Sequence, residues 1–301
     1  MTKPSRKHHY LPRRYLRGFA DSEGGFFVYD KLAGKIFPTS PDAAFFENHL
    51  NTVTLPDGSS SDFLEKLYTE TENEAWESLD EITHSTPDAP IAVRDKMDLF
   101  LFLSFLHWRL PGNAVCAEQL SQRFFGHDEK LGYFKMKSTE GTPVPEDVIH
   151  EIRTSPSWSQ TARLIIPFAP FFAGSTWYED LDNWRFVYAG DGGNWHIVGD
   201  NPIITRGDHD HDPVNCLREF IFPVSGRILL MSRGERLRSD EPLAPEFILQ
   251  HGTAIIERAQ RFVACHDRGF LSALVAMHGT HVRFGKTERI VPELFEMLTR
   301  V

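Results

Sequence analysis

The chain has 301 residues, of which 41% are hydrophobic and 25% are charged. This composition is typical of a folded globular protein and argues against extended disorder beyond the first few residues. The formal net charge of −10 at pH 7 disfavours general coating of nucleic acids, although six basic residues precede the first acidic one, Asp21.

The three cysteines, Cys116, Cys216 and Cys265, are far apart and have no CxxC spacing. This argues against a zinc ribbon or a disulfide framework and favours a reducing, cytoplasmic setting. The first seven residues are polar and basic, without the apolar segment of a secretory signal. The most apolar run, residues 97–110, is too short to span a bilayer, so we expect a cytoplasmic protein without a membrane segment.

The N-terminal part is predicted to be mixed. Pro12 suits the first turn of a short amphipathic helix, and residues 25–30 and 35–37 read as two strands. Residues 38–61 are rich in Pro, Asp, Asn and Ser and are expected to form a loop. Helical spacing of apolar residues then predicts helices at about 62–82, 93–110 and 113–125, with further helical segments up to residue 179.

The pattern changes at Asp182. Short apolar or alternating runs at 184–188, 195–198, 203–205, 219–223 and 228–231 predict an antiparallel meander. Helical patterns return at 245–265, 269–278 and 292–300. Because helices and strands are segregated, we predict an α+β fold in which a mainly helical body carries an antiparallel β-meander in its C-terminal half. Residues 1–301 are expected to form one integrated domain, with a helical part at about 62–180, the meander at about 183–232 and C-terminal helices at about 245–300.

The first candidate site lies at residues 8–12, with the sequence HHYLP. His8 and His9 directly precede the start of a helix, where Arg13 and Arg14 would help to bind phosphate or carboxylate. A neutral histidine there would serve as a metal ligand or as a general base. The alternative is that one histidine hydrogen-bonds a loop and that the arginines form a solvated helix face.

The second candidate is a pair of acids, Glu65 and Glu72, which are seven residues apart and share one face of a predicted helix. Carboxylates in this arrangement would ligate Mg²⁺ or Mn²⁺. The alternative is a helix cap at Glu65, paired with Asp62 in a capping box, and a solvated ion pair at Glu72.

Three further residues complete the candidate site. Asp200 and Asn201 precede Pro202 in a sequence that suits a turn, and Asp200 could equally serve a cleft as a base or ligand, with Asn201 binding substrate. Arg109 ends an apolar helix and therefore needs a carboxylate partner, either as a structural ion pair or as a clamp for an anion.

The alternating His and Asp residues at 208–212 are better explained as an exposed acidic loop than as a metal site.

The HHYLP segment, with Tyr15, Leu16 and Phe19 after it, resembles the HHYVP signature of a mostly bacterial family known as domain of unknown function 4238. Weaker similarities follow in order along nearly the whole chain, at residues 26–29, 64–66, 72, 109–111, 199–202, 222–225 and 259–263. Leu110 and His251 depart from the family pattern, which has Thr and Asn there. The resemblance implies that 259–263 belongs to a closing helix, and it implies no particular activity.

The sequence contains no P-loop, GxGxxG, HExxH or GxSxG motif. Two hypotheses remain. In the first, the protein is a hydrolase of phosphate-containing substrates, such as a metal-dependent nuclease. His8, His9, Asp200 and Arg109 would then be catalytic, and Glu65 and Glu72 would hold a divalent metal ion. In the second, the protein is a non-enzymatic module that binds a small anion, a nucleotide or an acidic partner. In a third interpretation, the HHYLP segment has only a structural role and packs the N-terminus onto the helices.

Overall fold

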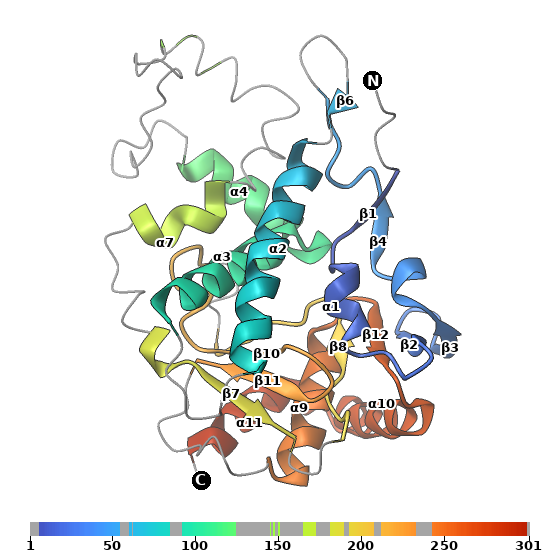
Figure 1. Ribbon diagram of the computed structural model, residues 1–301. Coiled ribbons are helices and arrows are strands. Elements are labelled where there is room, and N and C mark those ends of the chain that lie inside the picture. The colour runs from blue at the N-terminus through green and yellow to red at the C-terminus, as the bar shows by residue number, and fades with distance from the viewer. Residues whose placement is uncertain are drawn as a thin grey trace.

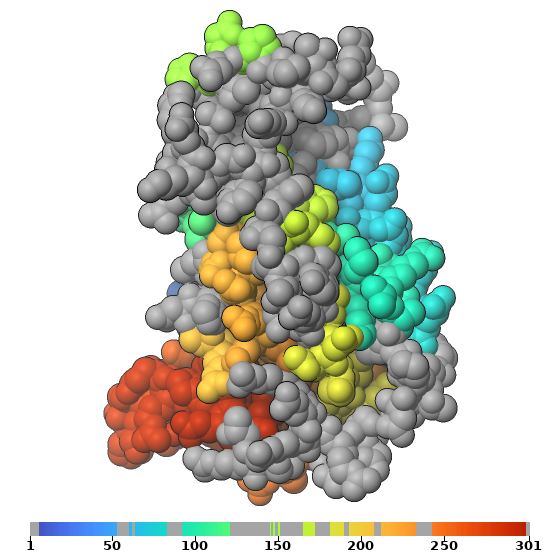
Figure 2. Space-filling view, turned by 90° about the vertical axis from the view of Figure 1, so that its left-hand side faces the viewer, coloured from blue at the N-terminus to red at the C-terminus, as the bar shows by residue number. Residues whose placement is uncertain are grey.

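The computed structural model describes residues 6–54, 60–61, 63–84, 92–124, 165–172, 181–189, 193–207, 212–232 and 243–299, together with Pro145, Asp147 and His150. Helices and antiparallel sheets occupy separate parts of the chain, which confirms the α+β class. In Figure 1, helices α2 and α3 lie above the strands β7, β10 and β11, and helices α9, α10 and α11 lie below them. Figure 2 shows the same C-terminal helices, in orange and red, at the lower end of the molecule.

The N-terminal segment forms a small sheet and a short helix. Strand β1 (Lys7–His9) pairs antiparallel with β4 (Phe46–Asn48), so that His8 lies opposite Glu47 and His9 opposite Phe46. Helix α1 (Arg13–Arg17) follows, with Pro12 at its N-cap. The interval predicted to be a loop, residues 38–61, contains β4, the 3₁₀ turn η1 (Pro41–Ala43) and the strands β5 (Val53–Thr54) and β6 (Ser60–Ser61). The loop prediction was therefore wrong in part, because its composition does not reveal pairing with a distant strand.

The helical part is built on α2 (Phe63–His84) and α3 (Val93–Arg109), which pack against each other. Helix α3 ends where Pro111 begins the 3₁₀ turn η2 (Pro111–Asn113), and α4 (Ala114–Phe124) follows. The shorter elements of this part are η4 (Ile166–Phe168), α7 (Ala169–Phe172) and η5 (Leu181–Asn183). These bounds agree with the predicted helices at 62–82, 93–110 and 113–125. Asp62, the predicted capping residue, lies outside the described residues.

Two four-stranded sheets form the centre of the molecule. One has the order β7 (Arg185–Tyr188), β11 (Ile228–Met231), β10 (Phe220–Pro223), β9 (Ile204–Thr205), and all its pairs are antiparallel. The other has the order β3 (Lys35–Thr39), β2 (Phe26–Asp30), β12 (Phe262–Cys265), β8 (Val198–Gly199). Only β9, β10 and β11 form a simple meander. The predicted strand 195–198 gives a two-residue strand that joins the other sheet.

The C-terminal part contains α9 (Pro245–Arg258), α10 (Arg268–Arg283), the 3₁₀ turn η7 (Thr287–Arg289) and α11 (Ile290–Thr299). The expected helix over 245–265 stops at Arg258, and residues 262–265 form β12 between β2 and β8. The closing helix implied for 259–263 is therefore wrong: residues 262 and 263 belong to β12, and residues 259–261 connect α9 to it. A short apolar run does not distinguish helix from strand, and here pairing on both sides decides for the strand.

The described residues form two large hydrophobic cores and a small third cluster of Leu64, Tyr68 and Phe105. The first packs α1, α2 and α3 against strands of both four-stranded sheets. In it, the ring of Tyr15 stacks on the ring of Phe222 in β10, with centroids 5.2 Å apart. The hydroxyl of Tyr15 donates to the carbonyl of Pro223 at 2.7 Å, which fixes α1 to β10. The second core lies between the strands and α9, α10 and α11. Within the described residues, no helix is long and apolar enough to cross a membrane.

Candidate functional site

The first part of the site is held by β1, whose alternation points His8 inward. His8 is fully buried, and its Nδ1 accepts a hydrogen bond of 2.8 Å from the backbone N–H of Asn51. The side-chain amide of Asn51 donates to Oε2 of Glu65, in the first turn of α2, at 2.7 Å. The structure thus links one predicted histidine to one predicted carboxylate through a residue that the sequence did not single out.

His9 has a different environment from His8. Nε2 of its ring is shielded from solvent and has no hydrogen-bond partner among the described residues. A neutral imidazole has one acceptor nitrogen, and Nε2 is that acceptor when the proton is on Nδ1.

The charge state of His9 follows from its surroundings. Burial is the largest effect and, with the nearby Arg13 guanidinium, it lowers the pKa of the ring below its ordinary value. The carboxylates of Asp42 and Glu65 act in the opposite direction and are weaker. The ring of Phe46 packs against His9 with centroids 5.6 Å apart. His9 is therefore a neutral base at neutral pH, in electrostatic contact with Glu65.

Arg109 lies at the end of α3 and is almost completely buried. Its Nη1 forms an ion pair with Oε1 of Glu72, and its Nε donates to the carbonyl of Tyr10 at 2.9 Å. The guanidinium carbon lies 5.2 Å from the centre of the Tyr68 ring. Nη2 is buried without a hydrogen-bond partner. We refer to His8, His9, Asn51, Glu65, Glu72 and Arg109 as the head site.

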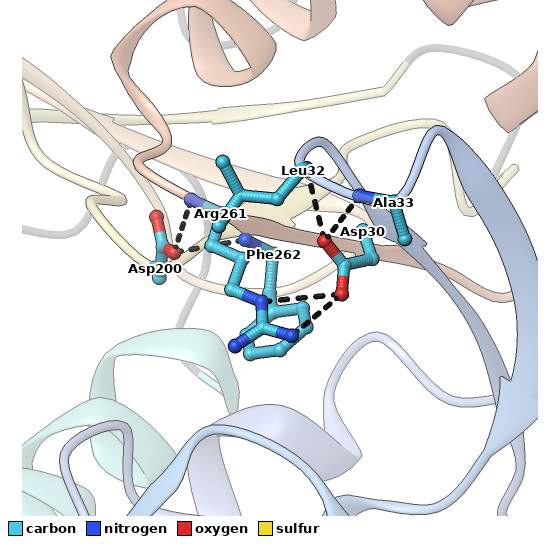
Figure 3. A network of polar contacts seen from close by, with 6 residues as sticks. All are labelled: Asp30, Leu32, Ala33, Asp200, Arg261 and Phe262. Atoms are coloured by element: carbon cyan, nitrogen blue, oxygen red, sulfur yellow. Dashed lines mark hydrogen bonds and ion pairs between the residues drawn. The ribbon is translucent and has the colours of Figure 1, made fainter.

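Asp200 is placed in a separate network (Figure 3). Its carboxylate accepts the backbone N–H bonds of Arg261 and Phe262 at 2.8 Å each, which Figure 3 draws. It also accepts the backbone N–H of Gln260 at 2.7 Å. Burial raises the pKa of Asp200, and the three N–H groups oppose this shift. Both oxygens are thus engaged in joining the turn after β8 to the start of β12. The neighbouring Asn201 keeps a buried side-chain oxygen without a partner.

A second carboxylate in Figure 3, Asp30, was not predicted as part of a site. Its Oδ1 accepts from the N–H groups of Leu32 and Ala33, which forms the β2–β3 turn. Its Oδ2 accepts from Nε and Nη2 of Arg261 at 3.1 and 2.9 Å. Arg261 also stacks on Phe262, with 4.5 Å between the guanidinium carbon and the ring centre. An Asp before a hairpin turn is a weak sequence signal, and nothing in the sequence pairs it with Arg261.

Tyr10 connects the head site to this network. Its carbonyl accepts from Arg109. Burial raises the pKa of its hydroxyl far above the ordinary value, and the nearby Asp200 and Glu47 carboxylates add to the effect. In addition, a Cβ added at Gly112 would meet Nε2 of Gln260 at 2.4 Å, so the end of α3 lies against the loop that binds Asp200. The two clusters are therefore neighbours, joined through Tyr10 and Gly112.

The predicted arginine face of α1 is exposed and paired with acids. Arg13 and Arg17 lie 3.5 and 3.8 Å from Oδ1 of Asp42, and Arg14 lies 2.7 Å from Oδ2 of Asp80. Arg14 also lies over the Trp76 ring, 5.4 Å from its centre. The acids partly neutralise this face, which reduces its attraction for a nucleic-acid backbone.

The predicted metal ligands Glu65 and Glu72 lie on one face of α2 but have separate partners, Asn51 and Arg109. Among the described residues, no group of three or more His, Cys, Asp or Glu side chains is placed to hold a metal ion. Most of the predicted segment 208–212 lies outside the described residues, and Asp212 accepts from the N–H groups of Val214 and Asn215.

Comparison with known proteins gives a family but no activity. No curated protein and no solved structure matches the chain. The family model described as "Protein of unknown function (DUF4238)" matches residues 7–269, which include β1, the head site and both sheets. The match extends from the first described strand to the beginning of α10. The chain therefore belongs to the DUF4238 family of proteins of unknown function.

Proposed function

We propose that the protein hydrolyses a phosphate-containing substrate at the head site. The observation that carries this proposal is Nε2 of His9, which is buried without a hydrogen-bond partner among the described residues, in a ring whose pKa is lowered by burial. A general base must be unprotonated, and the lowered pKa keeps the ring neutral at neutral pH. His8 does not offer the same chemistry, because its Nδ1 is occupied by Asn51.

Arg109 supplies the second element of the proposal. A buried guanidinium with one unused N–H arm binds a phosphate oxygen, and it stabilises negative charge better in a dry site than at the surface. Its other arms are fixed by Glu72 and by the Tyr10 carbonyl, so the free arm needs little reorganisation. Glu65 stabilises the imidazolium that forms when His9 accepts a proton, since its carboxylate raises the pKa of the ring.

In the proposed reaction a water molecule attacks phosphorus and transfers its proton to Nε2 of His9. The P–O bond to the leaving alcohol breaks, and the same proton, or one from solvent, protonates the departing oxygen. The Nε2 atom is shielded, so the side chains around it must move to admit a substrate. Magnesium or manganese ligation by Glu65 and Glu72 stays a prediction, and no step here depends on it.

Nucleic acid as the substrate is a narrower version of this proposal, and the pairing of Arg13, Arg14 and Arg17 with acids gives it little support. The non-enzymatic alternative, a module that binds an anion, is favoured by the free arm of Arg109 alone. The two functions differ in His9, because binding an anion does not require an unprotonated imidazole nitrogen.

The test is turnover of chromogenic phosphomonoesters and phosphodiesters, and of single-stranded nucleic acids, by the wild type and by His9→Asn. Asparagine is polar and of similar size but has no basic nitrogen. We expect kcat/KM to fall by about 10²- to 10⁴-fold with the fold intact. His281→Ala, on α10, is the matched histidine control and should retain full activity.

Two outcomes would overturn the hydrolase. One is turnover by His9→Asn equal to that of the wild type. The other is no turnover by the wild type, combined with saturable phosphate binding that Arg109→Lys abolishes and His9→Asn leaves unchanged. The second result would identify a binding module instead. Metal analysis of the purified protein, with assays before and after chelation, tests the predicted divalent ion separately.

A further inference from the structure

The pair of strands β1 and β4, which carries both predicted histidines, is bounded by unusual backbone. Among the described residues, two that are not glycine have a positive φ: Phe45 at 54° and His49 at 59°, directly before and after β4. Histidine tolerates this left-handed region comparatively well, whereas a bulky aromatic residue there is a genuine outlier. Such a conformation persists only where the surrounding structure enforces it, and residues of this kind cluster at functional sites.

The first hydrophobic core holds the side chain of Phe45. Its ring is 2% exposed and meets the rings of Tyr10, Phe26 and Phe262 edge-on, with centroids 6.1, 6.4 and 6.2 Å away. Edge-to-face contact is a favourable geometry for aromatic pairs, and burial of a phenyl ring is a large stabilising contribution for one side chain. The ring therefore anchors Phe45 against the strain of its own backbone.

The backbone of Phe45 connects this anchor to the head site. Its carbonyl accepts a hydrogen bond of 3.1 Å from the N–H of Tyr10, whose own carbonyl accepts from Nε of Arg109 at 2.9 Å. The next residue, Phe46, lies opposite His9 and packs against its ring. Because His9 and Tyr10 are neighbours in the chain, one left-handed residue restrains both the proposed base and the carbonyl that holds the guanidinium.

The pairing of β1 with β4 needs such a restraint, since the two form a two-stranded sheet of three residues each. Two-stranded pairs are marginally stable alone, and a slip of one residue moves every side chain to the opposite face. His8 is fully buried and His9 points to the other face, so a slip would exchange their environments. The bond from Tyr10 to Phe45 would be lost in a shifted register.

We propose that Phe45 is a positioning residue of the head site, whose left-handed backbone and anchored ring fix the register of β1 against β4. Phe45 thereby decides that His9, and not His8, occupies the position of the base. It acts through Tyr10 and Phe46. The expected effect on turnover rests on the proposed hydrolase, whereas the register of the strands does not.

The test replaces Phe45 by leucine and by isoleucine, which have the same atoms and differ in branching at Cβ. A β-branched residue is strongly disfavoured at positive φ, so Phe45→Ile should change the backbone while Phe45→Leu retains it. The matched control is the same pair of substitutions at Phe26, a core neighbour in the extended strand β2. We expect kcat to be about 10²-fold lower in Phe45→Ile than in Phe45→Leu, and equal in Phe26→Ile and Phe26→Leu.

Nuclear magnetic resonance measures the register without an activity assay. Cross-strand contacts between His9 and Phe46 should be present in the wild type and in Phe45→Leu and lost in Phe45→Ile. Exchange of the Tyr10 amide should be at least about 10-fold faster in Phe45→Ile than in Phe45→Leu. Equal contacts and equal exchange in these two variants would overturn the proposal. Absence of turnover by the wild type would remove the hydrolase, and the contacts would still decide the role of Phe45.

A second variant covers the case in which Phe45→Ile does not fold. Glycine adopts a positive φ without strain but removes the anchoring ring, so Phe45→Gly should also lose the contacts between His9 and Phe46. Contacts retained in Phe45→Gly would show that the ring does not fix the register. In the wild type, a short distance between the amide and α protons of Phe45 is expected, and an extended φ there would also contradict the proposal.

Discussion

Arg109 and Glu72 form an ion pair in which the arginine is 3% exposed and the glutamate 21%. The pair joins the end of α3 to the third turn of α2, while Nε of the same arginine binds the Tyr10 carbonyl at 2.9 Å. Three segments of the chain therefore meet at one guanidinium.

Replacing Glu72 should destabilise the protein strongly. In Glu72→Ala the guanidinium stays buried without its counter-ion, and we expect the free energy of unfolding to fall by about 3–5 kcal/mol. Glu70→Ala, at an exposed position of the same helix, should change it by less than about 0.5 kcal/mol. Urea unfolding followed by circular dichroism measures both. Equal stability of the two variants would show that the pair contributes little.

The two carboxylates of Figure 3 should differ in their effect on stability. Asp200→Asn keeps the shape but turns an N–H donor toward backbone donors, and we expect a loss of roughly 3 kcal/mol. Arg261→Gln removes a half-exposed partner of Asp30 and should cost less than Asp200→Asn. Thermal and urea unfolding compare them. A larger loss for Arg261→Gln would contradict the structural role assigned to Asp200.

Stability should fall in mild acid because of two buried histidines, His196 and His251, whose ring centroids lie 5.4 Å apart. The pKa of His196 is about 3 in the folded state and near 6.5 in the unfolded state, so the unfolded chain binds more protons between these values. The contribution is fully present above pH 6.5 and declines as the pH falls toward 3, by roughly 2 kcal/mol between pH 6.5 and 5. Unfolding free energies at pH 5 and 7 test this, and His196→Gln should reduce the difference between them.

The acidic limb of the pH–rate profile should respond to the charges around His9. Burial has the largest effect on the pKa of His9 and lowers it. Of the charged neighbours, the Arg13 guanidinium lowers this pKa further and the Glu65 carboxylate raises it. Glu65→Gln should therefore move the acidic limb of kcat/KM to lower pH, and Arg13→Gln should move it to higher pH. Both variants are compared with Glu70→Gln. Shifts in the same direction for Glu65→Gln and Arg13→Gln would remove His9 as the titrating base.

Local patterns predicted much of the helical part. Apolar spacing, together with Pro111, located α2, α3 and the end of α3, and the residues around Gly34 gave the β2–β3 hairpin. The need of Arg109 for a carboxylate also followed from the sequence, because an arginine at the end of an apolar helix is rarely buried alone. That this carboxylate is Glu72 came only from the structure.

The sequence by itself determined the elements whose stability depends on their own residues, together with the histidines and acids available for chemistry. The tertiary structure decided the rest. Residues 262–265 became a strand because β2 and β8 flank them, and the pKa of His9 is lowered because the fold buries its ring and brings Arg13 near it. Contacts between segments far apart in the chain leave no periodic signal, so His196 and His251 meet only once the chain has folded.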